Sequence, residues 1–199
     1  FGADFTSAKI NGANMNNVDK TKTDSFYEKS DTEMLQKYSN LSEEDFSNSK
    51  INNMDISESK FHKIDFSKSD MSNNKMAHVD FEGSDLSHTN LANAELIGAN
   101  LSGINLVGAD LSGANLSNSN LSGANLKDAI LDNSKLYGAD LSGAYLENTS
   151  FKKVDIKGAK FNGSYMTGVS FENMDLRNAN LQGIHMPGQN FKGLDLTGI

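Results

Sequence analysis

The sequence predicts an elongated all-β solenoid, in which the chain winds into a repeating coil of short extended segments. The first reason is periodicity: a bulky apolar residue stands at every fifth position from Leu41 to Leu196, 32 times without exception. A period of five fits neither a helix nor a flat strand and indicates a repeat architecture. The second reason is composition, since only 37% of the residues are hydrophobic and none is Trp. A solenoid needs no larger share of hydrophobic residues, because each of its coils contacts only the neighbouring coils and the core is a thin column.

The apolar position of each repeat, which we call the central position, defines the predicted core. Leu occupies it without interruption between residues 86 and 146, and Phe, Ile and Met replace Leu at many positions on either side. We expect the structural core to contain Leu86, Leu91, Leu96, Leu101, Leu106, Leu111, Leu116, Leu121, Leu126, Leu131, Leu136, Leu141 and Leu146. Burying one such side chain contributes about 1.5–3 kcal/mol, which offsets the entropy lost in ordering many turns.

The other four positions of a repeat have their own roles. The inner position, two residues before the central one, is small or apolar, as at Ala94, Ala99 and Ile104. Residues two apart in an extended segment point to the same side, so the inner residue should face the core and the outward residue between the two should face solvent. The first and second turn positions follow the central residue. They are often Ser-Gly or Ser-Asn, which suit tight turns.

This pattern of Ala, then Asp or Asn, then Leu and two turn residues strongly resembles the pentapeptide-repeat family. Consecutive repeats such as Gly98–Ser102, Gly103–Val107 and Gly108–Ser112 carry the resemblance. It covers residues 39–199 in one register and residues 3–17 in another. It implies a right-handed quadrilateral, or four-sided, parallel β-helix with four repeats in each 20-residue coil, and therefore about eight to nine coils for this chain.

The four faces of such a coil are numbered by their first central residues, Leu41, Phe46, Ile51 and Ile56. The inner residue is usually Ala, Ser or Thr, but it is Met, Ile or Leu at six positions, all of which fall on the second or the fourth face. These positions are Met54, Ile64, Ile104, Met174, Ile184 and Leu194. This alternation fits a tube with an even number of sides.

We expect one domain over residues 1–199, with a first coil in residues 1–18, an insertion in residues 19–38 and uninterrupted repeats in residues 39–199. The insertion breaks the five-residue rule, and two capping-box patterns within Ser25–Glu33 predict a short helix there. It is either a helical loop that lies against the rod or a protruding recognition element, since loops often carry function.

Charge and composition exclude several classes of protein. The formal net charge of −8 argues against direct binding to nucleic acid. The chain has no Cys, and no run of 18 apolar residues that would span a membrane. It begins at Phe1 without Met and ends inside a repeat at Ile199, so we expect it to be part of a longer protein. The open coil edges of such a rod favour end-to-end or dimeric self-association.

We find no catalytic constellation in the sequence. The histidines His62, His78, His88 and His185 fall on the first, fourth, second and second faces, which scatters them too widely for a metal site. Turn formation accounts for the abundant Ser, Asp and Asn, and the corner glycines recur too regularly to indicate a phosphate loop. A convex rod also lacks the concave pocket that catalysis normally needs. We therefore expect a protein that is not an enzyme and that uses no metal or cofactor.

The outward positions of the second face provide the candidate binding residues. Asp45, Asp65 and Asp85 begin this column, Asn105 and Asn125 continue it, and Tyr145, Tyr165 and His185 end it. Residues one coil apart would stack along the rod, so the last three would form an exposed aromatic ladder. Exposed rings with polar tips are common at protein interfaces. The alternative is a structural stack without a partner.

A non-catalytic protein-interaction scaffold is the favoured function. The resemblance suggests a module of a larger bacterial protein, either cytoplasmic or a secreted effector, because the family is common in bacteria. Some family members are acidic DNA mimics that bind type II topoisomerases such as gyrase, and the absence of Lys and Arg from residues 77–126 keeps that alternative open. However, Asp80, Asp85, Asp110 and Glu95 would project from four different faces. A rigid structural spacer is the third alternative.

Overall fold

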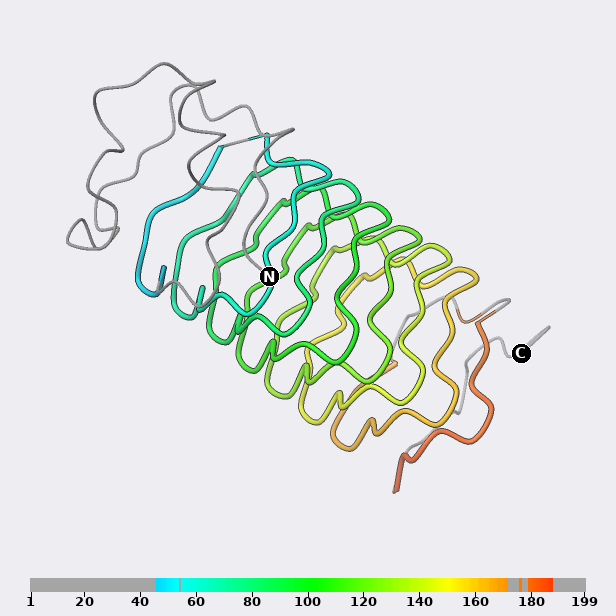
Figure 1. The fold of residues 1–199 in the computed structure, drawn as a ribbon. Coiled ribbons are helices and arrows are strands. Elements are labelled where there is room, and N and C mark those ends of the chain that lie inside the picture. The colour runs from blue at the N-terminus through cyan, green and yellow to red at the C-terminus, as the bar shows by residue number, and fades with distance from the viewer. Residues whose placement is uncertain (1–45, 54, 172–175, 177–178, 188–199) are drawn as a thin grey trace, which may run out of the picture.

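The computed structural model describes residues 46–53, 55–171, 176 and 179–187. These residues form a rod of stacked coils that runs from residue 46 at the cyan end to residue 187 at the red end (Figure 1). The predicted first coil, the predicted insertion and Asp45 lie outside the described residues.

Single-residue β-bridges hold the coils together. The described residues contain no helix and no strand of more than one residue. Each bridge joins an outward residue to the outward residue 20 positions further along the chain. Asp65 pairs with Asp85, for example, and Tyr145 pairs with Tyr165, always in the parallel sense. Each bridge therefore spans four repeats, which means that each coil has four sides. The predicted right-handed, four-sided β-helix is confirmed.

The central residues form one continuous core inside the rod. From Phe46 to Leu176 every one of them is at most 4% exposed, and the predicted leucines between residues 86 and 146 are at most 1% exposed. The inner alanines are buried beside them. At the N-terminal end of the described residues, the rings of Phe61 and Phe81 stack with centroids 5.3 Å apart. The in-and-out assignment made from the five-residue period is therefore correct.

Backbone hydrogen bonds run along the rod from coil to coil. The central N–H donates to the carbonyl of an outward residue in the next coil, as Leu86 N does to Asn105 O at 2.9 Å. The outward N–H donates to an inner carbonyl in the previous coil, as Asn90 N does to Ser69 O at 2.9 Å. These bonds take the place of a sheet ladder, which is why the rod forms without long strands.

The outward Asp or Asn satisfies a further backbone donor, in the turn that follows it. Its Oδ1 accepts from the N–H of the first turn residue, as Asp85 Oδ1 does from Ser87 N at 2.8 Å and Asn100 Oδ1 does from Ser102 N at 3.3 Å. This is an Asx-turn contact. It gives the physical reason why Asp and Asn recur at the outward position.

Candidate protein-interaction face

The second-face column changes in character along the rod. Asp65, Asp85, Asn105 and Asn125 are half-buried, whereas Tyr145, Tyr165 and His185 are exposed. Parallel bridges join every consecutive pair of these residues, so the column is continuous. The tyrosine side chains are longer and more exposed than the Asp and Asn side chains of the same column. We therefore call Asp65–Asn125 of this column its low half and Tyr145–His185 its raised half.

We call Tyr145, Tyr165 and His185 the aromatic ladder. The rings of Tyr145 and Tyr165 are stacked, with centroids 5.0 Å apart and planes 4° apart. The imidazole of His185 is tilted by 53° from the Tyr165 ring at a centroid distance of 5.9 Å. Tyr145 is 49% exposed and Tyr165 is 46% exposed. Stacking covers part of each tyrosine ring, and nearly half of each tyrosine remains exposed to solvent.

An open hollow of about 500 Å³ lies along the ladder. Besides the three ladder residues it is lined by Gly123, Asn125, Lys127, Glu147 and Thr167. Lys127 Nζ and Glu147 Oε2 form an ion pair of 3.2 Å at its edge. The hollow thus combines aromatic surface with an amide, a hydroxyl group and one charge of each sign.

The ladder tyrosines depart from the turn rule of this fold. Asn125 Oδ1 accepts from Lys127 N at 3.3 Å, as an outward Asn normally does. The phenol oxygen of Tyr lies too far from the backbone to accept a hydrogen bond from the N–H of the second residue after it. Tyr145 and Tyr165 therefore give up a local contact that Asp or Asn would supply. Residues that break a local rule are expected at functional sites.

The carboxylates at the other end of the column are engaged in the fold. Asp65 Oδ1 accepts from Ser67 N at 2.8 Å, and Asp85 Oδ1 accepts both from Ser87 N and from Asn105 Nδ2. Each therefore keeps one oxygen within the rod and leaves the other for outside contacts. Stabilisation of the turns is therefore enough to explain these two carboxylates, and no partner protein is needed to explain them.

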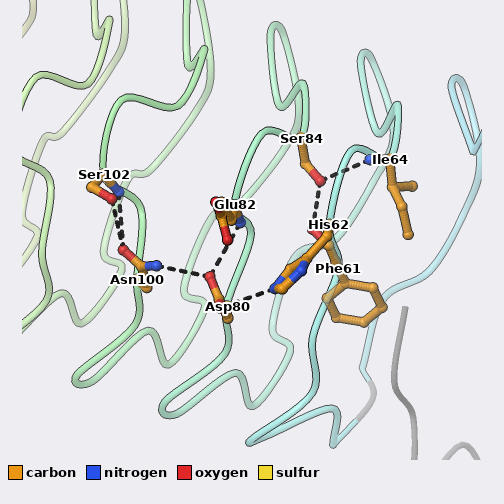
Figure 2. A network of polar contacts seen from close by, with 8 residues as sticks. All are labelled: Phe61, His62, Ile64, Asp80, Glu82, Ser84, Asn100 and Ser102. Atoms are coloured by element: carbon orange, nitrogen blue, oxygen red, sulfur yellow. Dashed lines mark hydrogen bonds and ion pairs between the residues drawn. The ribbon is translucent and has the colours of Figure 1, made fainter. Parts of the chain in front are cut away.

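Among the described residues, one cluster of candidate metal ligands was not expected from the sequence. The ligand atoms of His62, Asp80 and Glu82 all lie within 4.8 Å of one another, and His62 Nε2 is 3.0 Å from Asp80 Oδ2 (Figure 2). One imidazole and two carboxylates suit a divalent cation. The His62–Asp80 contact also explains the arrangement without an ion. A search for ligands on neighbouring coils of one face, rather than for several histidines, would have found the cluster.

Other outward apolar residues are dispersed. Ile130 is 41% exposed and Tyr137 is 52% exposed, whereas Ile97 and Val107 are half-buried. Ile130 belongs to the third face and Tyr137 to the corner that follows the fourth, so neither extends the ladder. None of the described residues forms a helix with the length and apolar character that crossing a membrane requires.

Comparison with known families identifies the repeat. Residues 75–113, 109–148 and 129–168 match the family model for pentapeptide repeats, with eight copies. A comparison with curated proteins found no match.

Several solved structures are similar to this chain. A pentapeptide repeat protein from the Arabidopsis thaliana thylakoid lumen is 37% identical over 48% of this chain and 63% of its own, with a TM-score of 0.37. Rfr23 from the cyanobacterium Cyanothece 51142 is 35% identical over 52% of this chain and 60% of its own, with a TM-score of 0.33. QnrB1, a plasmid-mediated fluoroquinolone resistance protein, is 23% identical over 72% and 78%, with a TM-score of 0.38. The chain spans less than two thirds of the first two proteins.

Proposed function

We propose that this chain, which belongs to the pentapeptide-repeat family, is a non-catalytic protein-interaction scaffold whose binding face is the aromatic ladder and the hollow beside it. The observation that carries the proposal is the pair of stacked, half-exposed tyrosines at outward positions where the fold itself favours Asp or Asn. Exposed Tyr rings supply contact area at little entropic cost and are enriched at interfaces. The hollow beside the ladder is open rather than enclosed, which suits contact with a protein surface better than catalysis.

A pull-down that compares the intact chain with Tyr145→Ala plus Tyr165→Ala tests this function. The matched control is Tyr137→Ala, which removes an equally exposed ring from another part of the rod. We expect the double variant to lose proteins that the intact chain and the control both retain. If all three proteins retain the same partners, the ladder is only a structural stack and the proposal fails.

The acidic DNA mimic is the alternative that the charge distribution partly favours. The described carboxylates in residues 77–126 have no Lys or Arg among them in sequence. They lie on all four faces, however, since Asp80, Asp85, Asp110 and Glu95 each bridge along a different column. Only Asp65 and Asp85 form a described acidic row on the second face, and amides follow them. This arrangement fits a line of phosphates poorly.

A gyrase supercoiling assay separates the two functions. The scaffold predicts no inhibition at low micromolar protein, and the same result for an Asp65→Asn plus Asp85→Asn variant. Inhibition that disappears in this variant would favour the mimic over the scaffold. A chain that is inert both in this assay and in the pull-down would be a rigid spacer.

A further inference from the structure

We infer that the second face binds a second copy of the same chain, with the two rods antiparallel. The inference rests on the proposed function, because it names the occupant of the same face. Along the second-face column, a low half with carboxylates and amides is followed by a raised half with phenols and an imidazole. Each half offers what the other lacks.

Symmetry decides which residues would meet. In a symmetric dimer the same patch is used on both copies. We place the two-fold axis between the two rods, perpendicular to their length, at the level between the coils of Asn125 and Tyr145. The column of one copy then faces the same column of the other copy, running in the opposite direction. The resulting pairs, each formed twice, are Tyr145–Asn125, Tyr165–Asn105, His185–Asp85 and Lys127–Glu147.

These pairs are chemically complementary. A phenol O–H can donate to an amide oxygen and an imidazole N–H to a carboxylate. Lys127 already pairs with Glu147 of its own copy at 3.2 Å, and in the dimer it also lies near the Glu147 carboxylate of the other copy. Asp85 keeps one carboxylate oxygen that its own turn does not use. Among the described residues of this face, no charge meets a like charge. Parallel rods would instead place Asp65 against Asp65 and Asp85 against Asp85, which like-charge repulsion disfavours.

The shapes also match. The tyrosines are nearly half exposed and stand above the half-buried amides, so reversal places the raised end of each copy over the low end of the other. Beside the column, the second turn position of the first face is Gly in six successive coils, from Gly83 to Gly183. A Cβ at Gly103, Gly123, Gly143 or Gly163 would meet nothing within 4 Å. This bare shoulder lets a neighbouring backbone come close.

The area of the face sets the expected strength. The column from Asp85 to His185 spans five coil steps, or about 24 Å at roughly 4.8 Å each. One face of a narrow rod over that length is smaller than the roughly 800 Å² per partner of a standard interface. We therefore expect a reversible dimer with a Kd on the order of 10 µM rather than a permanent one.

Sedimentation velocity of the purified chain tests for the dimer. The intact chain and Tyr137→Ala should shift from monomer to dimer between about 1 and 100 µM, and Tyr145→Ala plus Tyr165→Ala should remain monomeric. A monomer at all concentrations overturns the inference. In that case the pull-down still decides the proposed function, because loss of other proteins by the ladder variant would leave the scaffold intact with a different partner.

Cross-linking tests the antiparallel register, and the absence of natural Cys makes single-Cys variants clean. The register places Val107 against Thr167 of the other copy, whereas two copies of either residue lie well separated along the rod. A short bismaleimide should therefore cross-link a mixture of Val107→Cys and Thr167→Cys, and neither variant alone. Equal cross-linking of the single variants with themselves would mean another arrangement and would overturn the inference.

Discussion

At the residue scale, histidines at turn positions depend on the glycines one coil further along. His78 has a φ of 56° in the second turn position of the fourth face, and Gly98 occupies the same position in the next coil with a φ of 65°. A Cβ built on Gly98 would lie 2.5 Å from Nδ1 of His78, so the imidazole covers the place where a side chain would be. His88 covers Gly108 in the same way.

Two alanine substitutions separate backbone strain from this packing. Gly103 has a φ of 62°, but a Cβ there meets nothing within 4 Å. We expect Gly103→Ala to lose about 1 kcal/mol in urea unfolding, from the left-handed backbone alone. Gly98→Ala should lose about twice that amount, because the His78 ring must also move.

The double variant His78→Ala plus Gly98→Ala supplies the control. Without the imidazole, the cost of Gly98→Ala should fall to that of Gly103→Ala, which gives a coupling energy of about 1 kcal/mol. A coupling near zero would mean that the ring and the glycine are independent.

The sequence predicts residue roles unevenly at this scale. The burial of the central leucines from Leu86 to Leu146 could be predicted because it follows from the period of five alone. The covering of Gly98 by His78 could not, because it depends on the direction in which a turn side chain leans toward the next coil. For the same reason the contact between His62 and Asp80, which also joins neighbouring coils, was missed.

At the scale of the repeat, the turn is stabilised by its outward carboxylate or amide. Burial would raise the pKa of the Asp140 carboxyl, but hydrogen bonds from Ser142 and the charge of Lys160 together lower it below the ordinary value. Ser142 N donates to Asp140 Oδ1 at 3.0 Å, and Lys160 Nζ is 3.6 Å from Asp140 Oδ2. The pKa of Asp70 is lowered in the same way, with Ser72 and Asn52 as donors.

These lowered pKa values predict a loss of stability in acid. Because the pKa of each carboxyl is lower in the folded than in the unfolded chain, its contribution is complete above the ordinary value of 3.8 and is lost as the pH falls through the folded value. Asp140→Asn should therefore be less stable than the intact chain near neutral pH, by at most about 0.5 kcal/mol because Lys160 is exposed and Asp140 is only half-buried. The difference should vanish below about pH 3 in urea melts.

Lys160→Gln is the control for the carboxylate. It should cause part of the same loss near neutral pH, and no further loss in the Asp140→Asn background. An Asp140→Asn deficit that persists unchanged in acid would assign the effect to the amide substitution rather than to the charge. The sequence predicts the outward direction of Asp140, but the lowered pKa requires the donors and Lys160 at their observed distances.

At the scale of the whole molecule, two periods have separate consequences. The period of five decides which side chains are buried, whereas the longer period of one coil decides which surface residues share a column. The fold could be predicted from the sequence because spatial neighbours are always one coil apart in the chain. The raised and low halves of the second face could not, because they depend on how far each side chain projects.

Three deletions test this separation. Removing Ser102–Ile104 breaks the five-residue phase, so polar residues would enter the core and the cooperative urea transition should be lost. Removing Leu101–Asp110, which is half a coil, or Leu101–Asn120, which is a full coil, keeps the phase of five. Both variants should therefore fold, with stability lower roughly in proportion to the coils removed. Circular dichroism and urea melts measure this outcome.

Besides this difference in stability, the half-coil and full-coil deletions differ in what they do to the surface. The full-coil deletion leaves the aromatic ladder on the same face as Asp65 and Asp85, and reversal still places His185 and the tyrosines against acids and an amide. The half-coil deletion rotates the ladder to the opposite face of the rod. We therefore expect the full-coil deletion to dimerise in sedimentation velocity and the half-coil deletion to dimerise more weakly, although both are folded. The half-coil deletion keeps Asn125 opposite Tyr145, but it replaces Asp85 with Lys75 as the partner of His185. Dimers of equal strength in the two variants would place the contact outside the second face, because that face is continuous in only one of them.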